Sequence, residues 1–257
     1  KAGRTLGSGG KHCPEERGPS LPLERVVGVE DLQHRVGIGI VLQAENGKMD
    51  VFSVGHDARI GDKVIGYLGK IKFEGEIVAC IDDEEGRDIS LIKVSNIPSD
   101  IKFESLSIGY PPIRRKFKAH IAFSDFGKIG TDIRLVPENI ETVSVPAKCM
   151  RHPPEEVKNL DIHTKGTKLR QVGVSGAPVF YKGKDEKIRL VGMIYATGIK
   201  KRYCYAVTGN TILGFLRKTE YGEKLRNQSP RNGTGTKTSP REGGGIGSNK
   251  NLFAPSR

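Results

Sequence analysis

Val36-Gly-Ile-Gly-Ile-Val-Leu42, Glu45-Asn-Gly47 and Met49-Asp-Val-Phe-Ser-Val54 are three successive segments that together decide the fold class. The outer two are rich in apolar and β-branched residues, which favour strands. The Asn-Gly pair between them favours a tight turn. This pattern predicts an antiparallel hairpin that ends near Gly55-His56-Asp57-Ala58.

Short runs of the same kind recur along the chain, separated by Gly, Asp, Asn or Pro. They are Lys63–Leu68, Gly75–Cys80, Ile89–Val94, Phe117–Phe123, Ile133–Leu135, Glu141–Val145, Ala177–Tyr181, Ile188–Tyr195 and Tyr203–Val207. Many short strands with little helical periodicity predict an all-β sandwich or barrel. The exception is Thr211–Leu225, whose apolar residues have near-helical spacing.

Length and charge bound the classes of protein that remain possible. The chain has 257 residues and a formal net charge of +12. No run approaches the ~20 apolar residues of a membrane-spanning helix. Residues 1–24 have the composition of a flexible lead-in, and residues 226–257, which carry about +5, that of a disordered basic tail. The start at Lys1 suggests a piece excised from a longer precursor.

The four cysteines are Cys13, Cys80, Cys149 and Cys204, and no two of them have CxxC spacing. We therefore predict no zinc site and no disulfide framework. Cys80 and Cys204 lie in apolar runs and are expected in the core. No cofactor is expected, and we interpret the compartment as reducing.

The segment that most directly suggests a catalytic function is Gly173-Val-Ser-Gly-Ala-Pro-Val-Phe180. Gly173 has no Cβ, so the N–H groups of Gly173 and Ser175 could point towards one substrate oxyanion. Pro178 directs the chain into the next strand. The alternative is a loop without chemistry, because such sequences are common.

A nucleophilic serine needs a base and a carboxylate that orients the base. His56 ends a hydrophobic strand, and Asp88 directly precedes the apolar strand Ile89–Val94. Asp82 and Asp83, in an acidic hairpin tip, are alternatives to Asp88. The remaining histidines have no comparable motif around them. They are His34, His120, His152 and His163, and we assign the last two to a solvated loop.

These segments resemble those of the chymotrypsin-like serine proteases. Ser53-Val54-Gly55-His56 resembles that family's T-A-x-H segment, and Arg87–Val94 resembles D-I-A-L-L-K-L. Gly173–Val179 resembles G-D-S-G-G-P-V, and Leu190–Ile194 resembles L-V-G-I-V. The resemblance spans about residues 33–220, in the order His, Asp, Ser.

The resemblance implies two six-stranded antiparallel β-barrels with a C-terminal helix. Residues 25–110 would form the barrel that carries His56 and Asp88. Residues 111–225 would form the barrel that carries Ser175 and the helix. The implied activity is that of a serine endopeptidase with His56, Asp88 and Ser175 as its triad.

Departures from the family pattern favour one subgroup. His56 and Asp88 are only 32 positions apart, Val174 replaces the acid before the serine, and no cysteines are paired near His56. These features resemble the 3C-like proteases of positive-strand RNA viruses, of which astrovirus and sobemovirus-like enzymes keep a serine nucleophile. The resemblance implies polyprotein processing in the host cytoplasm, with membrane association through flanking segments of the polyprotein.

The family fold also suggests which residues would contact the substrate. Ile194, Tyr195 and Ala196 would form the strand beside the P1 side chain, and Lys168–Val172 would form the far wall of the pocket. Many 3C-like proteases have a histidine where Ile194 stands, so glutamine specificity is not predicted. Lys168 and Arg170 favour an acidic P1 residue if they face the pocket; solvent exposure of both is the alternative.

The other function class is a catalytically inactive barrel that binds RNA. Its candidate contacts are Arg114–Lys116, Lys200–Arg202 and the basic tail. The sequence does not interleave aromatic residues with these clusters, as a stacking platform would. A polypeptide substrate is therefore the leading expectation, with RNA as the alternative partner.

Overall fold

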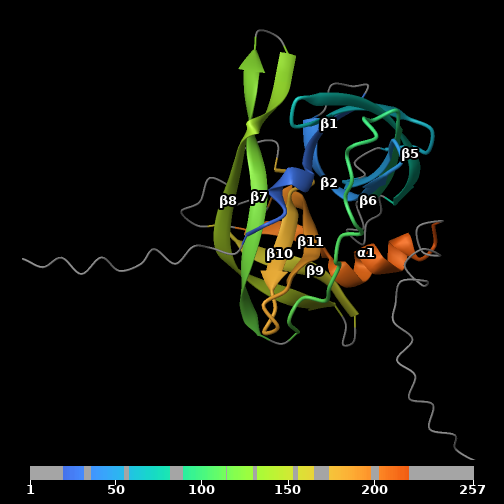
Figure 1. The fold of residues 1–257 in the computed structure, drawn as a ribbon. Coiled ribbons are helices and arrows are strands. Elements are labelled where there is room, and N and C mark those ends of the chain that lie inside the picture. The colour runs from blue at the N-terminus through green and yellow to red at the C-terminus, as the bar shows by residue number, and fades with distance from the viewer. Residues whose placement is uncertain are drawn as a thin grey trace, which may run out of the picture.

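The computed structural model describes residues 20–31, 36–54, 58–81, 89–113, 115–129, 132–152, 156–164, 174–197 and 203–219. Two closed antiparallel barrels of six strands each make up most of this part of the chain (Figure 1). This confirms the predicted fold class. The expected boundaries at residues 24, 110 and 225 stay predictions.

The first barrel has the strand order β1-β2-β3-β6-β5-β4: two antiparallel three-stranded units, β1-β2-β3 and β4-β5-β6, pair through β1 with β4 and through β3 with β6 and so close the barrel. Its strands are β1 (Val26–Asp31), β2 (Val36–Glu45), β3 (Lys48–Ser53), β4 (Lys63–Leu68), β5 (Ile71–Ile81) and β6 (Ile89–Ser95). The expected β2–β3 hairpin is confirmed. Asn46 and Gly47 both have positive φ, 53° and 74°, as a type I′ turn requires.

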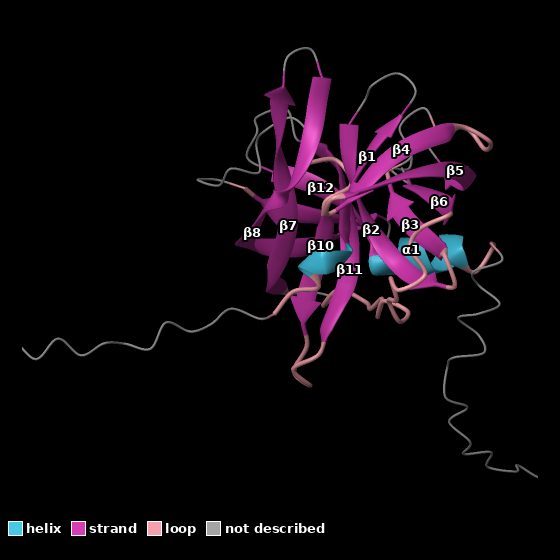
Figure 2. Cartoon of the chain, turned by 45° about the horizontal axis from the view of Figure 1, so that its top comes forward, coloured by secondary structure: helices cyan, strands magenta, loops and turns pink. Residues whose placement is uncertain are grey.

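The second barrel has the order β10-β11-β12-β9-β8-β7. Its strands are β7 (Lys116–Ile129), β8 (Asp132–His152), β9 (Glu156–His163), β10 (Pro178–Lys182), β11 (Ile188–Thr197) and β12 (Tyr203–Thr208). Figure 2 shows the two sets of strands side by side, with α1 (Gly209–Leu216) in cyan below the first barrel.

Three strands depart from the sequence expectations. β1 and β9 were not predicted, and Ile133–Leu135 and Glu141–Val145 belong to the single long strand β8. β9 was missed because its buried residues Leu160 and Ile162 alternate with polar residues over only a short stretch of sequence. The solvated loop proposed for His152 and His163 is therefore wrong: the first ends β8 and the second ends β9.

The helix is shorter than predicted. α1 spans Gly209–Leu216 rather than Thr211–Leu225, and the side chain of Thr208 caps it by accepting from the Thr211 amide at 3.3 Å. It ends because the chain continues in turns, where the Thr219 amide and hydroxyl both donate to the Leu216 carbonyl. A short 3₁₀ turn, η1 (Leu23–Arg25), precedes β1. No helix in the described residues is long and apolar enough to cross a membrane.

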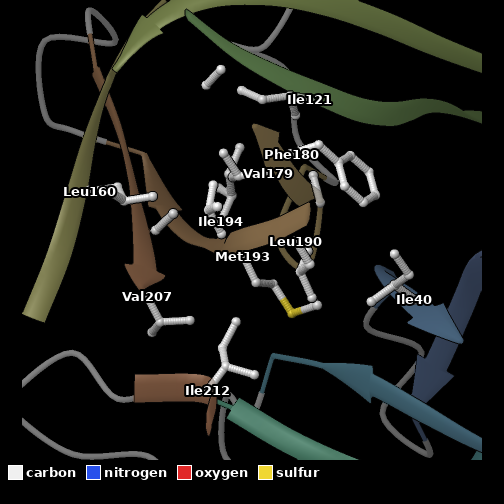
Figure 3. Packing of buried hydrophobic residues seen from close by; sticks show 14 of the residues in the cluster. Ile40, Ile121, Leu160, Val179, Phe180, Leu190, Met193, Ile194, Val207 and Ile212 are labelled. Carbon is white, nitrogen blue, oxygen red and sulfur yellow. The ribbon is translucent and has the colours of Figure 1, made fainter. Parts of the chain in front are cut away.

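Two hydrophobic clusters hold the barrels, and β2 contributes to both. Ile38, Ile40 and Leu42 belong to the cluster that fills the second barrel and its contact with the first. Val41 and Ala44 belong to the cluster inside the first barrel. Figure 3 shows Ile40 in one cluster with residues of β10, β11 and α1. Because β2 is buried on both faces, it fixes one barrel against the other.

None of the described cysteines, Cys80, Cys149 and Cys204, forms a disulfide. Cys204 is fully buried, as predicted, and Cys149 is buried as well. Cys80 is half-buried and packs against the cluster inside the first barrel.

Candidate active site

Ser175 lies in a tight turn that connects to β10. The Ala177 amide donates to the Val174 carbonyl at 3.0 Å, which closes the turn around Ser175 and Gly176. Gly176 has a φ of +85°, a backbone conformation that costs glycine little and other residues much more. The local sequence therefore folds as a sharp turn with the serine at its tip.

Both barrels hold this turn in place. The Ile38 amide of β2 donates to the Ser175 carbonyl at 2.8 Å. The Gly176 amide donates to the Ile194 carbonyl of β11 at 2.7 Å, and the Ile194 amide donates to the Ala177 carbonyl at 2.9 Å. A Cβ on Gly176 would lie 1.6 Å from the Ile38 carbonyl oxygen. Only glycine permits so close an approach to β2.

Ser175 lines a cavity of about 140 Å³ at one end of the first barrel. The cavity wall includes Val54, just beyond β3, and Ala58, four residues later in the chain. Ser90 and Asp62 also contribute to it. A serine of the second barrel thus faces a hollow whose wall the first barrel supplies.

Two buried serine hydroxyls fix the strand ends around this cavity. Ser90 Oγ, in β6, donates to the Val54 carbonyl at 2.8 Å, and Ser53 Oγ donates to the Ile38 carbonyl at 2.9 Å. Ser53 and Ser90 are also a cross-strand pair of β3 and β6. The ends of β2, β3 and β6 are therefore tied together next to Ser175.

Sequence reasoning did not identify Ser53, Ser90 or Asp62 as part of this site. Asp62 accepts from the Arg59 amide at 2.9 Å and so orders the turn that borders the cavity. Both serines lie inside segments that resemble the family, Ser53–His56 and Arg87–Val94, but their contacts depend on the register of β3 with β2 and β6. The spacing of residues along the sequence gives no signal of such pairing.

Some of the other predicted site residues are described by the structure, and the rest lie outside the described residues. The described ones form the strand predicted to contact P1. Ile194 has a fully buried side chain and offers its backbone to the Ser175 turn, whereas Tyr195 and Ala196 are half-buried. The pairing of β11 with β12 shifts register between Ile194 and Ala196. Outside the described residues lie His56, Asp88, Gly173, Lys168 and Arg170.

In the described part of the chain, no group of three or more His, Cys, Asp or Glu side chains could hold a metal ion. Ser175 lines a cavity from the tip of a constrained turn. A turn of this kind can present a nucleophile to a substrate carbonyl.

No family model matches this chain. No curated protein matches it either.

Among solved structures, the chain is similar to the active form of the Rv3671c protease from M. tuberculosis. The sequence identity is 17% and the TM-score 0.50, over 77% of this chain and 83% of that one. The inactive form gives 17% and 0.49, over 77% and 92%. A human pathogenic astrovirus serine protease gives 15% and 0.47, over 73% and 91%. The likeness to the active form, together with the two barrels, shows that this chain has the chymotrypsin-like fold.

Proposed function

We propose that this protein is a serine endopeptidase in which Ser175 is the nucleophile, His56 the general base and Asp88 the carboxylate that orients His56. The observation that carries the proposal is the constrained Ser175 turn, held by β2 and β11 beside a cavity of the first barrel. The fold alone does not carry it, because one fold hosts many functions.

The described residues around the cavity support the roles of His56 and Asp88. Val54 and Ala58 both line the cavity, and His56 stands between them in the sequence. The Ser90 hydroxyl donates to the Val54 carbonyl, and Asp88 stands two residues before Ser90. This hydrogen bond thus joins the segment that leads to His56 with the strand that follows Asp88, and each of its two residues is two positions from a proposed partner of Ser175.

In the proposed reaction His56 takes the Ser175 proton as Oγ attacks a peptide carbonyl. The N–H groups of Gly173 and Ser175 would stabilise the resulting oxyanion, and each such donor contributes about 3–4 kcal/mol. His56 then protonates the leaving amine, and water hydrolyses the acyl-enzyme by the reverse sequence. Asp88 keeps the imidazole in the required tautomer throughout.

The substrate we propose is a viral polyprotein, cleaved in the reducing cytoplasm of a host cell. The short interval between His56 and Asp88 and the Val174 before the serine support the 3C-like subgroup. The Cys149 thiol, which is buried and forms no disulfide, fits a reducing compartment. An acidic P1 residue, read by Lys168 and Arg170, is the specificity to test first.

Labelling with a fluorophosphonate tests the nucleophile directly. We expect stoichiometric modification of Ser175, detected by peptide mass spectrometry, that disappears in Ser175→Ala and in His56→Ala. Ser95→Ala, at the exposed end of β6, is the control and should label as the wild type does. A folded wild-type protein that does not label would contradict the proposal.

Three matched variants test the carboxylate: Asp88→Asn, Asp82→Asn and Asp83→Asn. We expect only the first to lower the labelling rate, by about 10⁴-fold as for loss of a triad carboxylate. An equal loss in Asp82→Asn or Asp83→Asn would reassign the orienting acid. A peptide library varied at P1 then tests the substrate class.

A further inference from the structure

A second cavity, of about 450 Å³, lies on the outer face of the second barrel. It spans β7, β8, β9 and β12, which are neighbours in the barrel. Its lining includes Lys116, Pro146, Lys148, Asp161, His163 and Tyr203. None of these residues lines the cavity beside Ser175.

Two positive charges face each other across neighbouring strands in this cavity, which destabilises the protein when no anion is bound. Lys116 of β7 lies directly opposite Lys148 of β8, and both are exposed. Like charges in directly opposed positions destabilise a sheet. Lys148 also lies opposite Asp161 of β9, the one carboxylate among the described lining residues. Two adjacent ammonium groups against one carboxylate favour the binding of an anion.

Two aromatic rings border the same cavity. His163 and Tyr203 are a cross-strand pair of β9 and β12. Their ring centroids are 5.1 Å apart with an interplanar angle of 85°, so the two rings meet edge to face. Tyr203 is 40% exposed, one of the few large hydrophobic side chains that the described residues leave so open. The contact with His163 holds an accessible phenol ring beside the lysines.

We propose that this cavity binds single-stranded RNA, with a base stacked on Tyr203 and backbone phosphates on Lys116 and Lys148. Stacking on an aromatic side chain beside a positively charged track is how proteins hold unpaired nucleotides. The Asp161 carboxylate is an acceptor for the ribose 2′-hydroxyl, the group that distinguishes RNA from DNA.

An acidic peptide fits the same surface less well. Its carboxylates would pair with the lysines as phosphates would, so charge alone does not distinguish the two ligands. The peptide would leave Tyr203 without a planar partner. The exposed cations Arg115 and Lys118 of the same stretch extend the positive surface along β7, as a phosphate backbone requires.

The decisive experiment is fluorescence anisotropy with a short fluorescein-labelled oligoadenylate and the full chain. Tyr203→Ala should raise the Kd by about 5-fold or more, whereas Tyr203→Phe, which keeps the ring, should bind as the wild type does. Tyr110→Ala removes another exposed tyrosine and should leave the Kd unchanged. An unchanged Kd in Tyr203→Ala, with a wild-type Tm, would overturn the proposal.

The lysines are tested through the salt dependence of binding. Lys148→Ala should weaken binding and reduce the slope of log K against log salt by about 0.7, the value for one phosphate contact of a single strand. Lys72→Ala removes an exposed lysine of the first barrel and is the matched control. Equal effects of the two substitutions would show diffuse attraction by the basic chain and would overturn the site.

Two competitors test the identity of the ligand. Oligodeoxyadenylate should bind more weakly than the RNA in the wild type and equally well in Asp161→Ala. If oligoglutamate displaced the RNA as efficiently as unlabelled oligoadenylate did, the cavity would be a general anion site and the proposal would fail. All variants retain Ser175, so proteolytic activity provides an independent check that the proteins are folded.

Discussion

The backbone carbonyl of Ser175, in the second barrel, accepts a hydrogen bond from the amide of Ile38, in the first, at 2.8 Å. The turn that presents the proposed nucleophile is therefore anchored to the barrel that would supply its base. Any change that separates β2 from this turn alters the position of the Ser175 hydroxyl relative to the cavity.

Gly176→Ala tests this anchoring. The new Cβ would lie 1.6 Å from the Ile38 carbonyl oxygen, in a residue with a φ of +85°. We expect the free energy of unfolding to fall by more than about 2 kcal/mol, with loss of fluorophosphonate labelling. Chemical denaturation measures the first effect.

The matched control is Gly214→Ala in α1, where a Cβ would meet nothing within 4 Å. Replacing a glycine inside a helix by alanine should raise the free energy of unfolding by about 0.5–1 kcal/mol. If both substitutions had the same effect, Gly176 would not be the contact that fixes the turn.

Ser90→Ala and Ser53→Ala separate stability from positioning. Each removes a buried hydroxyl that donates to a backbone carbonyl, so each should cost about 1–3 kcal/mol of stability. Only Ser90 bonds to Val54, the residue from which the chain continues towards His56. We expect Ser90→Ala to lower the labelling rate at Ser175 and to shift its pH profile more than Ser53→Ala does. Equal profiles for the two variants would assign Ser90 a purely structural role.

Much of the fold follows from local sequence. Asn46-Gly47 predicts its own turn, and the apolar run of β2 predicts a strand, because both depend on neighbouring residues. β1 and β9 escape prediction because part of their pairing is with strands far away in the chain. β1 pairs with β4 as well as with β2, and β9 pairs with β12 as well as with β8.

The candidate site shows the same division. The sequence around Ser175 predicts a turn with a nucleophile, and the structure has that turn. The contributions of Ser53 and Ser90 depend on cross-strand register, which no spacing reveals. Sequence reasoning likewise found no aromatic residue among the basic clusters. Barrel closure brings Tyr203 beside Lys116 and Lys148 across long chain separations.

His120 makes stability depend on pH. Its Nδ1 lies 2.9 Å from the Ser144 hydroxyl, and burial, followed by the nearby charges of Lys118 and Lys182, lowers its pKa below the ordinary 6.5. The unfolded chain therefore binds a proton at this residue at higher pH than the folded protein does. The resulting stability is fully present above about pH 6.5 and is lost as the pH falls towards the folded pKa.

Urea denaturation at a series of pH values measures this dependence. We expect the free energy of unfolding to decrease as the pH falls below about 6.5, and His120→Gln to flatten that decrease. A variant with the same slope as the wild type would show that other groups cause it.

Cys149 should resist alkylation in the native protein. Its thiol is buried and donates to the Pro112 carbonyl at 3.1 Å, and burial raises its pKa to about 11. At about pH 8 roughly one thiol in a thousand would be the reactive thiolate. Peptide mass spectrometry after iodoacetamide should therefore find Cys149 unmodified in native protein and modified in denaturant. The half-buried Cys80 is the internal comparison and should react first. Rapid native alkylation of Cys149 would mean that β8 separates readily from the segment around Pro112, because only opening of this contact exposes the sulfur.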